Sequence, residues 1–218
     1  MKKSITASLL LLLLLLAGCG EKEELFTPGH VSERTYENAT LGLKCIAPAD
    51  WDYLTEAELL QLGEVPPVQE GQEEQTLSQR LSAHLNSGGQ VQDMYVMTAD
   101  GLQTINVMVT KFDLTAQEMD IAAFTDLAKE ELASVYRSMG IIEVETQREQ
   151  VLFLDEQCEA VRLSGYYSDV PLHSLQLCMT RGSYICVVTL NSYVEDNTEL
   201  LMKFFHPLTV EEEDANLQ

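Results

Sequence analysis

Apolar residues recur at helical spacing in several segments of this chain. Thr55 and Glu58 form a capping-box pattern before the first of these segments, and Gly63 ends it. A second short helix is predicted over residues 77–85, where leucines recur every four positions. These signals predict two short helices in the first half of the chain.

The longest predicted helix begins with another capping-box pattern, Thr115 and Glu118. Apolar residues then recur at spacings of three and four: Ile121, Phe124, Ala128, Leu132, Val135 and Met139. Gly140 is the predicted end of this helix. A last helix is predicted over residues 195–205, before Pro207.

Alternation of apolar and polar residues predicts strands in the remaining segments. Residues 94–97 and 105–109 flank Asp100-Gly101, a typical hairpin turn. Four further apolar runs lie within residues 141–190, separated by short polar connections. Because such short connections cannot hold parallel crossovers, the strands should be antiparallel. The predicted class is α+β, a mostly antiparallel sheet covered by helices.

The amino terminus has the layout of a secretory signal peptide. Lys2 and Lys3 precede an apolar segment that has 12 residues when counted from Ile5 to Leu16. At 1.5 Å per helical residue this segment spans about 18 Å, well short of a hydrocarbon core of about 30 Å. We therefore do not expect it to remain as a membrane-spanning helix.

The end of this segment, Leu16-Ala17-Gly18-Cys19, resembles the lipobox of bacterial lipoproteins. In that family the cysteine sulfur receives a diacylglyceryl group, and a peptidase cuts before the cysteine. Two acyl chains such as palmitate give a stable anchor, at about 0.8 kcal/mol per buried CH₂. The resemblance implies lipidation at Cys19 and a lipid-anchored protein on the extracytoplasmic side of a cell membrane. An ordinary secreted protein is the alternative.

The chain divides into four predicted parts. Residues 1–18 form the lipoprotein signal peptide, and the polar residues 19–34 form a tether. Residues 35–208 form a single domain, long enough to bury one core. The acidic residues 209–218 form a solvated tail.

Charge disfavours two classes of partner. Removal of Lys2 and Lys3 leaves 11 basic against 35 acidic side chains, so the net charge falls from −22 to −24. Such a surface repels nucleic acid phosphates and anionic headgroups. We expect no nucleic acid partner, and we expect membrane attachment through the lipid on Cys19.

Four cysteines remain after lipidation of Cys19: Cys45, Cys158, Cys178 and Cys186. An exported protein with four such residues can form two disulfides, in three connectivities. Cys178 and Cys186 flank a turn, and a three-residue loop would place them opposite each other for a disulfide. The spacing does not fix that register, and free buried thiols are equally compatible with the sequence.

Several short motifs resemble those of exported lipoproteins with the PsbP-like fold. The first group is Tyr36-x-Asn38, Gly42, Pro48 and Trp51, and the second is Gly182-x-Tyr184, Thr189 and Phe204-Phe205. The resemblance spans roughly residues 36–206, although Leu43 and Cys45 replace aromatic residues common in the family and Asp50 replaces a frequent glycine. It implies a PsbP-like α/β/α sandwich with a non-enzymatic binding or accessory role, and it transfers no active-site residues. Trp51 is interpreted as a core residue.

The sequence contains no common catalytic or metal-binding motif. Gly-rich phosphate loops, G-x-S-x-G, H-E-x-x-H and paired C-x-x-C patterns are missing. The four histidines, His30, His84, His173 and His206, lack ligand spacing, so neither a metal nor a cofactor is expected. Four tyrosines could line a sugar- or peptide-binding surface, but strand aromatics more often pack within the sheet: Tyr95, Tyr166, Tyr167 and Tyr184.

The leading functional hypothesis is a lipid-anchored extracytoplasmic lipoprotein that serves as a non-enzymatic binding or accessory module of the cell envelope. An envelope protein is its expected partner. Two alternatives stay open. One is an envelope hydrolase that uses acidic residues, and the other is a solute-binding component of a transporter, for which the chain is short.

Replacement of the lipidation residue tests the anchor directly. Cys19→Ala should abolish acylation and release the protein from membranes, because no other segment is predicted to hold it there. Fractionation of cells with radiolabelled palmitate measures both effects. A variant that stays membrane-bound and fully processed would reject the lipoprotein assignment.

Overall fold

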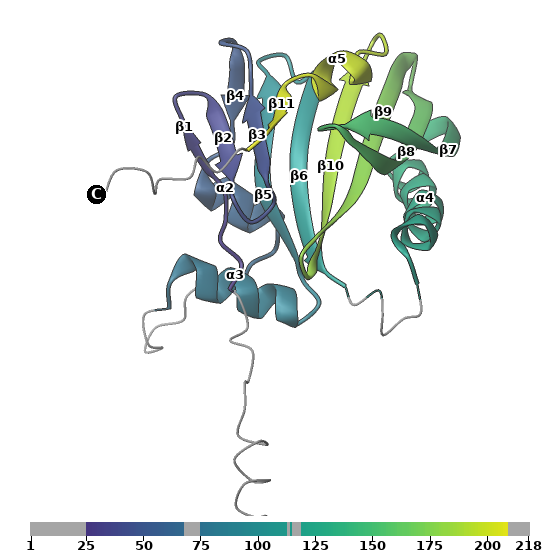
Figure 1. The fold of residues 1–218 in the computed structure, drawn as a ribbon. Helices are drawn as coiled ribbons and strands as arrows, with labels where there is room; N and C mark the ends of the chain where they lie inside the picture. Colours follow the sequence, from purple (N-terminus) through teal and green to yellow (C-terminus); the bar gives the residue numbers. More distant parts are fainter. Residues whose placement is uncertain (1–24, 68–74, 113, 115–118, 209–218) are drawn as a thin grey trace, which may run out of the picture.

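The computed structural model describes residues 25–67, 75–112, 114 and 119–208, and its largest element is a seven-stranded sheet (Figure 1). In spatial order its strands are β4 (Trp51–Tyr53), β5 (Gln90–Thr98), β6 (Gln103–Lys111), β10 (Tyr184–Tyr193), β9 (Val170–Arg181), β8 (Glu156–Tyr167) and β7 (Ile141–Phe153). Neighbouring strands in this sheet pair in antiparallel fashion. The predicted α+β class with a mostly antiparallel sheet is confirmed.

A second, smaller sheet was not predicted. It contains β1 (His30–Ser32), β2 (Thr35–Asn38), β3 (Leu43–Ile46) and β11 (Phe205–Pro207), in that spatial order. The helices are α2 (Glu56–Leu62), α3 (Leu77–Asn86), α4 (Ile121–Ser138) and α5 (Thr198–Met202). The small sheet, α2 and α3 pack on one face of the large sheet, whereas α4 packs on the other face against β7, β8 and β9 (Figure 1). Within the described ranges, no helix is long and apolar enough to cross a membrane.

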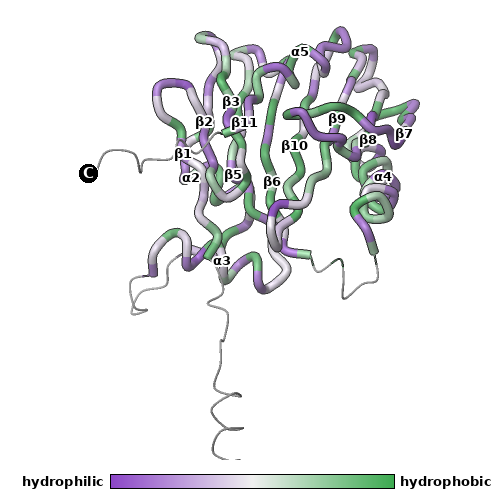
Figure 2. Tube along the Cα trace, viewed as in Figure 1, coloured by the Kyte–Doolittle hydropathy of each residue, from purple (hydrophilic) through white to green (hydrophobic). Residues whose placement is uncertain are grey.

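The main core lies between the two sheets. Its strand residues alternate in and out, as in Ile105, Val107 and Val109 of β6, each fully buried. Hydrophobic positions gather on the central strands β6, β10 and β9, and the edge strand β7 is largely hydrophilic (Figure 2). Trp51 is buried as predicted, and its ring stacks edge-on against Phe204 at 5.7 Å.

The first capping box and the first predicted hairpin turn are confirmed. The Thr55 hydroxyl accepts from the Glu58 amide, and the Glu58 carboxylate accepts from the Thr55 amide at 2.8 Å. Helix α3 begins with an equivalent box at Thr76. Asp100-Gly101 connects β5 to β6, and Gly101 has a φ of +70°, which a side chain would disfavour.

The longest helix begins later than the sequence predicts. Its N-cap is Asp120, whose side chain accepts from the Ala123 amide at 2.7 Å. The predicted capping box of Thr115 and Glu118 lies outside the described residues. Gly140, with a φ of +90°, directly follows the end of the helix, as predicted.

The last helix is present but shorter than the predicted 195–205, and a short strand follows it. Helix α5 covers only five residues, and residues 205–207 form β11, which pairs with β3. Phe205 is buried opposite Cys45, and its ring stacks against Phe153 at 5.4 Å. Burial of this ring in the core overrides the local helical pattern.

The predicted tether ends too late in the sequence. Residues 25–34 belong to the domain, because they contain β1 and the fully buried Phe26. The Phe26 ring stacks edge-on against Tyr184 at 5.4 Å, and its amide donates to the Ser82 hydroxyl at 2.7 Å. This segment therefore folds with the core.

The two cysteines considered for a disulfide lie on opposite faces of the large sheet. In the β9–β10 hairpin Cys178 pairs with Val187, and Cys186 pairs with Met179. The loop has two residues, 182–183, instead of the three that would align the thiols. A one-residue difference in register moves a side chain to the other face. The disulfide therefore does not form, and the four cysteines of the described ranges are free and buried.

Truncation of the Phe26 ring tests whether the amino-terminal segment belongs to the fold. Phe26→Ala should lower the free energy of unfolding by about 3–5 kcal/mol, because it leaves a cavity against Tyr184. Leu25→Ala, at a neighbouring position that is 45% exposed, should change it by less than about 0.5 kcal/mol. Urea denaturation of both variants measures the difference, and equal effects would contradict the structure.

Candidate functional site

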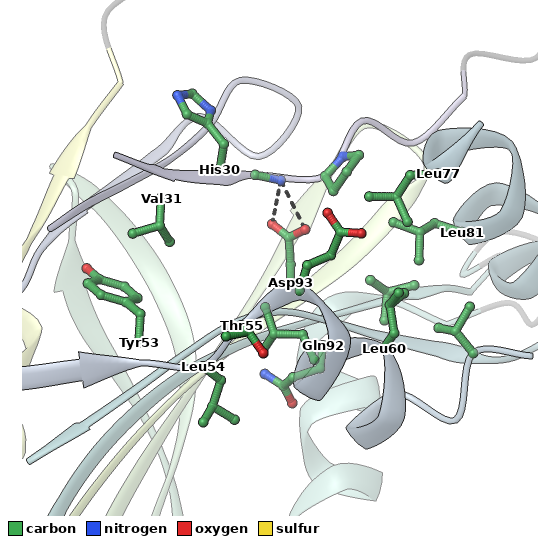
Figure 3. Close-up of a pocket in the computed structure, with 16 residues that line it drawn as sticks. His30, Val31, Tyr53, Leu54, Thr55, Leu60, Leu77, Leu81, Gln92 and Asp93 are labelled. Carbon is green, nitrogen blue, oxygen red and sulfur yellow. Dashed lines mark hydrogen bonds between the residues drawn. The ribbon is translucent and has the colours of Figure 1, made fainter. Parts of the chain in front are cut away.

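A pocket of about 460 Å³ opens between the amino-terminal segment, α2, α3 and β5 (Figure 3). Its walls are mostly aliphatic: Leu54, Leu59, Leu60, Val65, Leu77 and Leu81. Leu60 of α2 lies across the pocket from Leu77 and Leu81 of α3. The volume falls within the range of small-molecule sites, about 300–1,000 Å³.

The pocket exists because the apolar face of α2 is incompletely covered. This seven-residue helix packs mainly on β5 and has no buried residue. Leu59 and Leu60 are only half-buried, although a helix normally buries its apolar face against another element. The space between α2 and α3 therefore has apolar walls without side chains that fill it.

The inner wall of the pocket carries one carboxyl group, that of Asp93. The register of β5 against β6 shifts between Gln92 and Met94, so Asp93 is the extra residue of a β-bulge. The bulge directs Asp93 toward the small sheet, where it is only 6% exposed. A polar side chain in this position needs partners, because an unpaired buried polar group is costly.

Three groups donate hydrogen bonds to the Asp93 carboxylate. The Gly29 amide lies 3.1 Å from both oxygens (Figure 3), and the Asn38 amide Nδ2 lies 2.7 Å from Oδ2. The Tyr36 hydroxyl donates to the same Oδ2. A Cβ atom at Gly29 would lie 2.3 Å from the Tyr36 ring, so only glycine allows this close approach.

Burial raises the pKa of Asp93, and the hydrogen bonds from Tyr36, Asn38 and Gly29 offset part of that rise. Burial, followed by the nearby Asp93, raises the pKa of Tyr36 well above its ordinary value. The accepting oxygens of Asp93 thus already have protein donors. This carboxyl group holds the fold together and offers little to a substrate.

Polar residues near the mouth are few. His30 and Glu56 are exposed there. Gln92 uses its Nε2 to donate to the carbonyls of Met94 and Val107, at 2.8 and 3.0 Å. The site therefore consists of an apolar interior and a sparsely polar rim, an arrangement suited to binding an apolar group.

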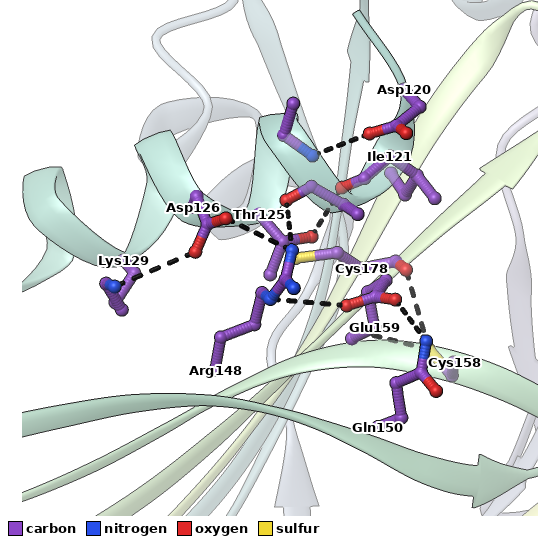
Figure 4. A network of polar contacts seen from close by, with 12 residues as sticks. Asp120, Ile121, Thr125, Asp126, Lys129, Arg148, Gln150, Cys158, Glu159 and Cys178 are labelled. Carbon is purple, nitrogen blue, oxygen red and sulfur yellow. Dashed lines mark hydrogen bonds and ion pairs between the residues drawn. The ribbon is translucent and has the colours of Figure 1, made fainter.

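A second polar cluster joins α4 to the large sheet on its other face (Figure 4). Arg148 forms ion pairs with Asp126 at 3.1 Å and with Glu159 at 3.7 Å. Gln150 donates to Glu159 at 2.5 Å. Asp126 and Arg148 are partly exposed, so their pair adds little stability. The cluster connects α4 to β7 and β8. It contains no nucleophile paired with a base.

The structure does not bring the predicted tyrosines together on one surface. Tyr184 is buried against Phe26, and Tyr95 is half-buried on β5. Tyr166 and Tyr167 are 42% and 57% exposed, at the far end of β8. A shared sugar- or peptide-binding surface made by all four is therefore excluded.

The histidines and cysteines form no reactive site in the described part of the chain. His84 of α3 donates from Nε2 to the Gly63 carbonyl at 3.0 Å, and the other three histidines lie on β1, β9 and β11. Burial raises the pKa of Cys178 to about 11, which keeps the thiol protonated and unreactive. No group of three metal-ligating side chains is present among these residues. Cys19 lies outside them.

Sequence reasoning missed Asp93 as a site residue. The available signal was a lone acidic residue between Val91 and Met94, in a segment otherwise suited to a buried strand. Only the bulge, which depends on pairing with β6, turns this residue inward.

No protein-family model matches the chain, and no curated protein matches its sequence. The solution structure of the cyanobacterial PsbP protein CyanoP, from Synechocystis sp. PCC 6803, is similar with a TM-score of 0.48 and 11% identity, over 88% of this chain and 99% of that chain. LpqN of Mycobacterium tuberculosis, which is involved in cell envelope biogenesis, is similar with a TM-score of 0.31 and 11% identity, over 74% and 76% of the two chains.

Removal of the Asp93 charge should alter the pH dependence of stability. Because the pKa of Asp93 is raised in the folded protein, protonation favours folding. This contribution is fully present below the unfolded pKa of 3.8 and is lost as the pH rises through the folded pKa. As the pH is lowered from about 7 to about 4, the free energy of unfolding of the native protein should therefore rise relative to that of Asp93→Asn.

Urea denaturation over this pH range measures that difference. Asp52→Asn, at an exposed position on β4, controls for the loss of one negative charge. A constant difference between the native protein and Asp93→Asn would contradict the raised pKa.

Proposed function

We propose that this chain is a lipid-anchored, non-enzymatic binding protein on the extracytoplasmic side of a bacterial cell membrane. The observation that carries the binding role is the aliphatic pocket. The buried carboxyl group in its wall, that of Asp93, already accepts hydrogen bonds from Gly29, Tyr36 and Asn38. The signal-peptide pattern and the lipobox at Cys19 support the location.

A hydrolytic role receives less support from the pocket. Acid hydrolases of sugars need two carboxyl groups that face the same bound substrate. Asp93 is turned into the interior, and the other carboxylate at the pocket, Glu56, is exposed on the first turn of α2. Binding therefore accounts for the geometry better than catalysis does.

A role as a transporter's solute-binding component also fits less well. Such proteins close two domains around a ligand by hinge motion. Here the pocket lies at one side of a single core, between α2 and α3. We therefore propose an accessory or carrier role that this domain performs next to the membrane.

Site-specific photocrosslinking in intact cells tests the binding role. A benzophenone amino acid in place of Val31, an exposed residue at the pocket, should form an adduct with an envelope component. The matched control replaces Leu127, which is 58% exposed on α4, and should not form that adduct. Identical adducts at both positions, or none at Val31, would contradict the proposal.

A further inference from the structure

We infer that the pocket between α2 and α3 binds the aliphatic chain of an uncharged amphiphile drawn from the adjoining membrane. This inference rests on the proposed function, because the lipid on Cys19 brings the pocket to the bilayer. Three observations lead to it: the chemistry of the walls, the length of the tether and the charge of the chain.

The walls favour an alkyl chain over a polar ligand. Leu60 of α2 lies opposite Leu77 and Leu81 of α3, and Leu54 and Val31 extend the apolar lining (Figure 3). The carboxyl group in the interior already has three protein donors, so it offers no free site for a polar headgroup. Each methylene transferred from water into such a site should strengthen binding up to about fourfold.

The tether keeps the pocket close to the lipid. Pro28 lines the pocket and lies nine residues after Cys19. Nine residues reach at most about 32 Å when fully extended. Bilayer lipids are then the most concentrated source of alkyl chains within reach of the pocket.

The charge of the protein selects against anionic headgroups. The mature chain carries a net charge of −24, and the exposed Glu56 and His30 are among the residues that line the pocket. Like charges repel, so an anionic amphiphile should bind more weakly than an uncharged one with the same chain. The ligand is therefore an alkyl chain with an uncharged, polar headgroup that remains at the rim.

Titration calorimetry on residues 19–218 with Cys19→Ser measures the affinity for amphiphiles. This variant carries no lipid anchor. The probes are octyl, decyl and dodecyl maltoside and dodecyl sulfate, all below their critical micelle concentrations. Affinity for the maltosides should rise with chain length, by up to about fourfold per methylene. Dodecyl sulfate should bind more weakly than dodecyl maltoside. No binding, or affinity independent of chain length, would overturn the inference.

Two tryptophan variants on the same helix locate the binding. Leu60→Trp fills the pocket and should weaken dodecyl maltoside binding by about tenfold or more, because several methylenes of the dodecyl chain can no longer be buried there. Leu62→Trp, at a position 55% exposed outside the pocket, should leave the affinity unchanged. Unfolding temperatures of both variants confirm that they fold. If Leu60→Trp retains native affinity, the amphiphile binds elsewhere and the inference fails.

Binding measurements on the natively lipidated protein test whether the alkyl chain in the pocket comes from a separate amphiphile or from the protein's own lipid. The lipidated protein should bind dodecyl maltoside as the Cys19→Ser chain does. Loss of binding after lipidation would mean that its own acyl chain fills the pocket, which would overturn the assignment to a separate amphiphile. The titrations of the Cys19→Ser chain need no anchor, so their failure is distinct from a failure to find acylation at Cys19.

Discussion

The Asp93 carboxylate joins three parts of the molecule that are distant in sequence. It accepts hydrogen bonds from Gly29 of the amino-terminal segment and from Tyr36 and Asn38 of the small sheet, and its own backbone belongs to the large sheet. Because a buried carboxylate without donors is strongly destabilising, the two sheets must keep the spacing at which all these donors reach it. Asn38 extends this constraint, since its Oδ1 accepts from the Leu41 amide at 2.9 Å and fixes the turn between β2 and β3. One bulged residue thereby sets the arrangement of the amino-terminal third of the domain.

The same constraint explains why an apolar pocket stays open beside a well-packed core. Elsewhere, aromatic rings close the space between layers, as Phe26 does against Tyr184 and Phe153 does against Phe205. At the pocket, Gly29 must remain a glycine, so position 29 contributes no side chain that could fill the space. Helix α2 packs on β5 and not on α3. Leu59 and Leu60 of α2 and Leu77 of α3 therefore remain only half-buried at the pocket, although Leu60 and Leu77 also pack against the core.

Local signals in the sequence were sufficient for elements that depend on local interactions. The box at Thr55 and the turn at Asp100-Gly101 involve residues within a few positions of each other, and both appear as predicted. The missed features depend on partners far along the chain. The bulge at Asp93 requires β6, and β11 forms because Phe205 is buried in the core against residues far from it in sequence. Which residue of β10 lies opposite Cys178 depends on the loop length, and a change of one residue there moves the partner to the other face. The spacing of the cysteines does not reveal that length.

In the proposed function, the amino-terminal segment both connects the domain to its lipid and lines the pocket. A tether that ended at residue 34 would place fifteen residues between Cys19 and the domain, with a reach of about 56 Å from Cys19 to residue 35. Burial of Phe26 moves the start of the domain to Leu25, which leaves five residues between Cys19 and the domain and a reach of about 21 Å. The next residues, Pro28 and Gly29, line the pocket, and Gly29 is bonded to Asp93. In the proposed function, the segment that attaches the domain to its anchor is therefore also a wall of its binding site.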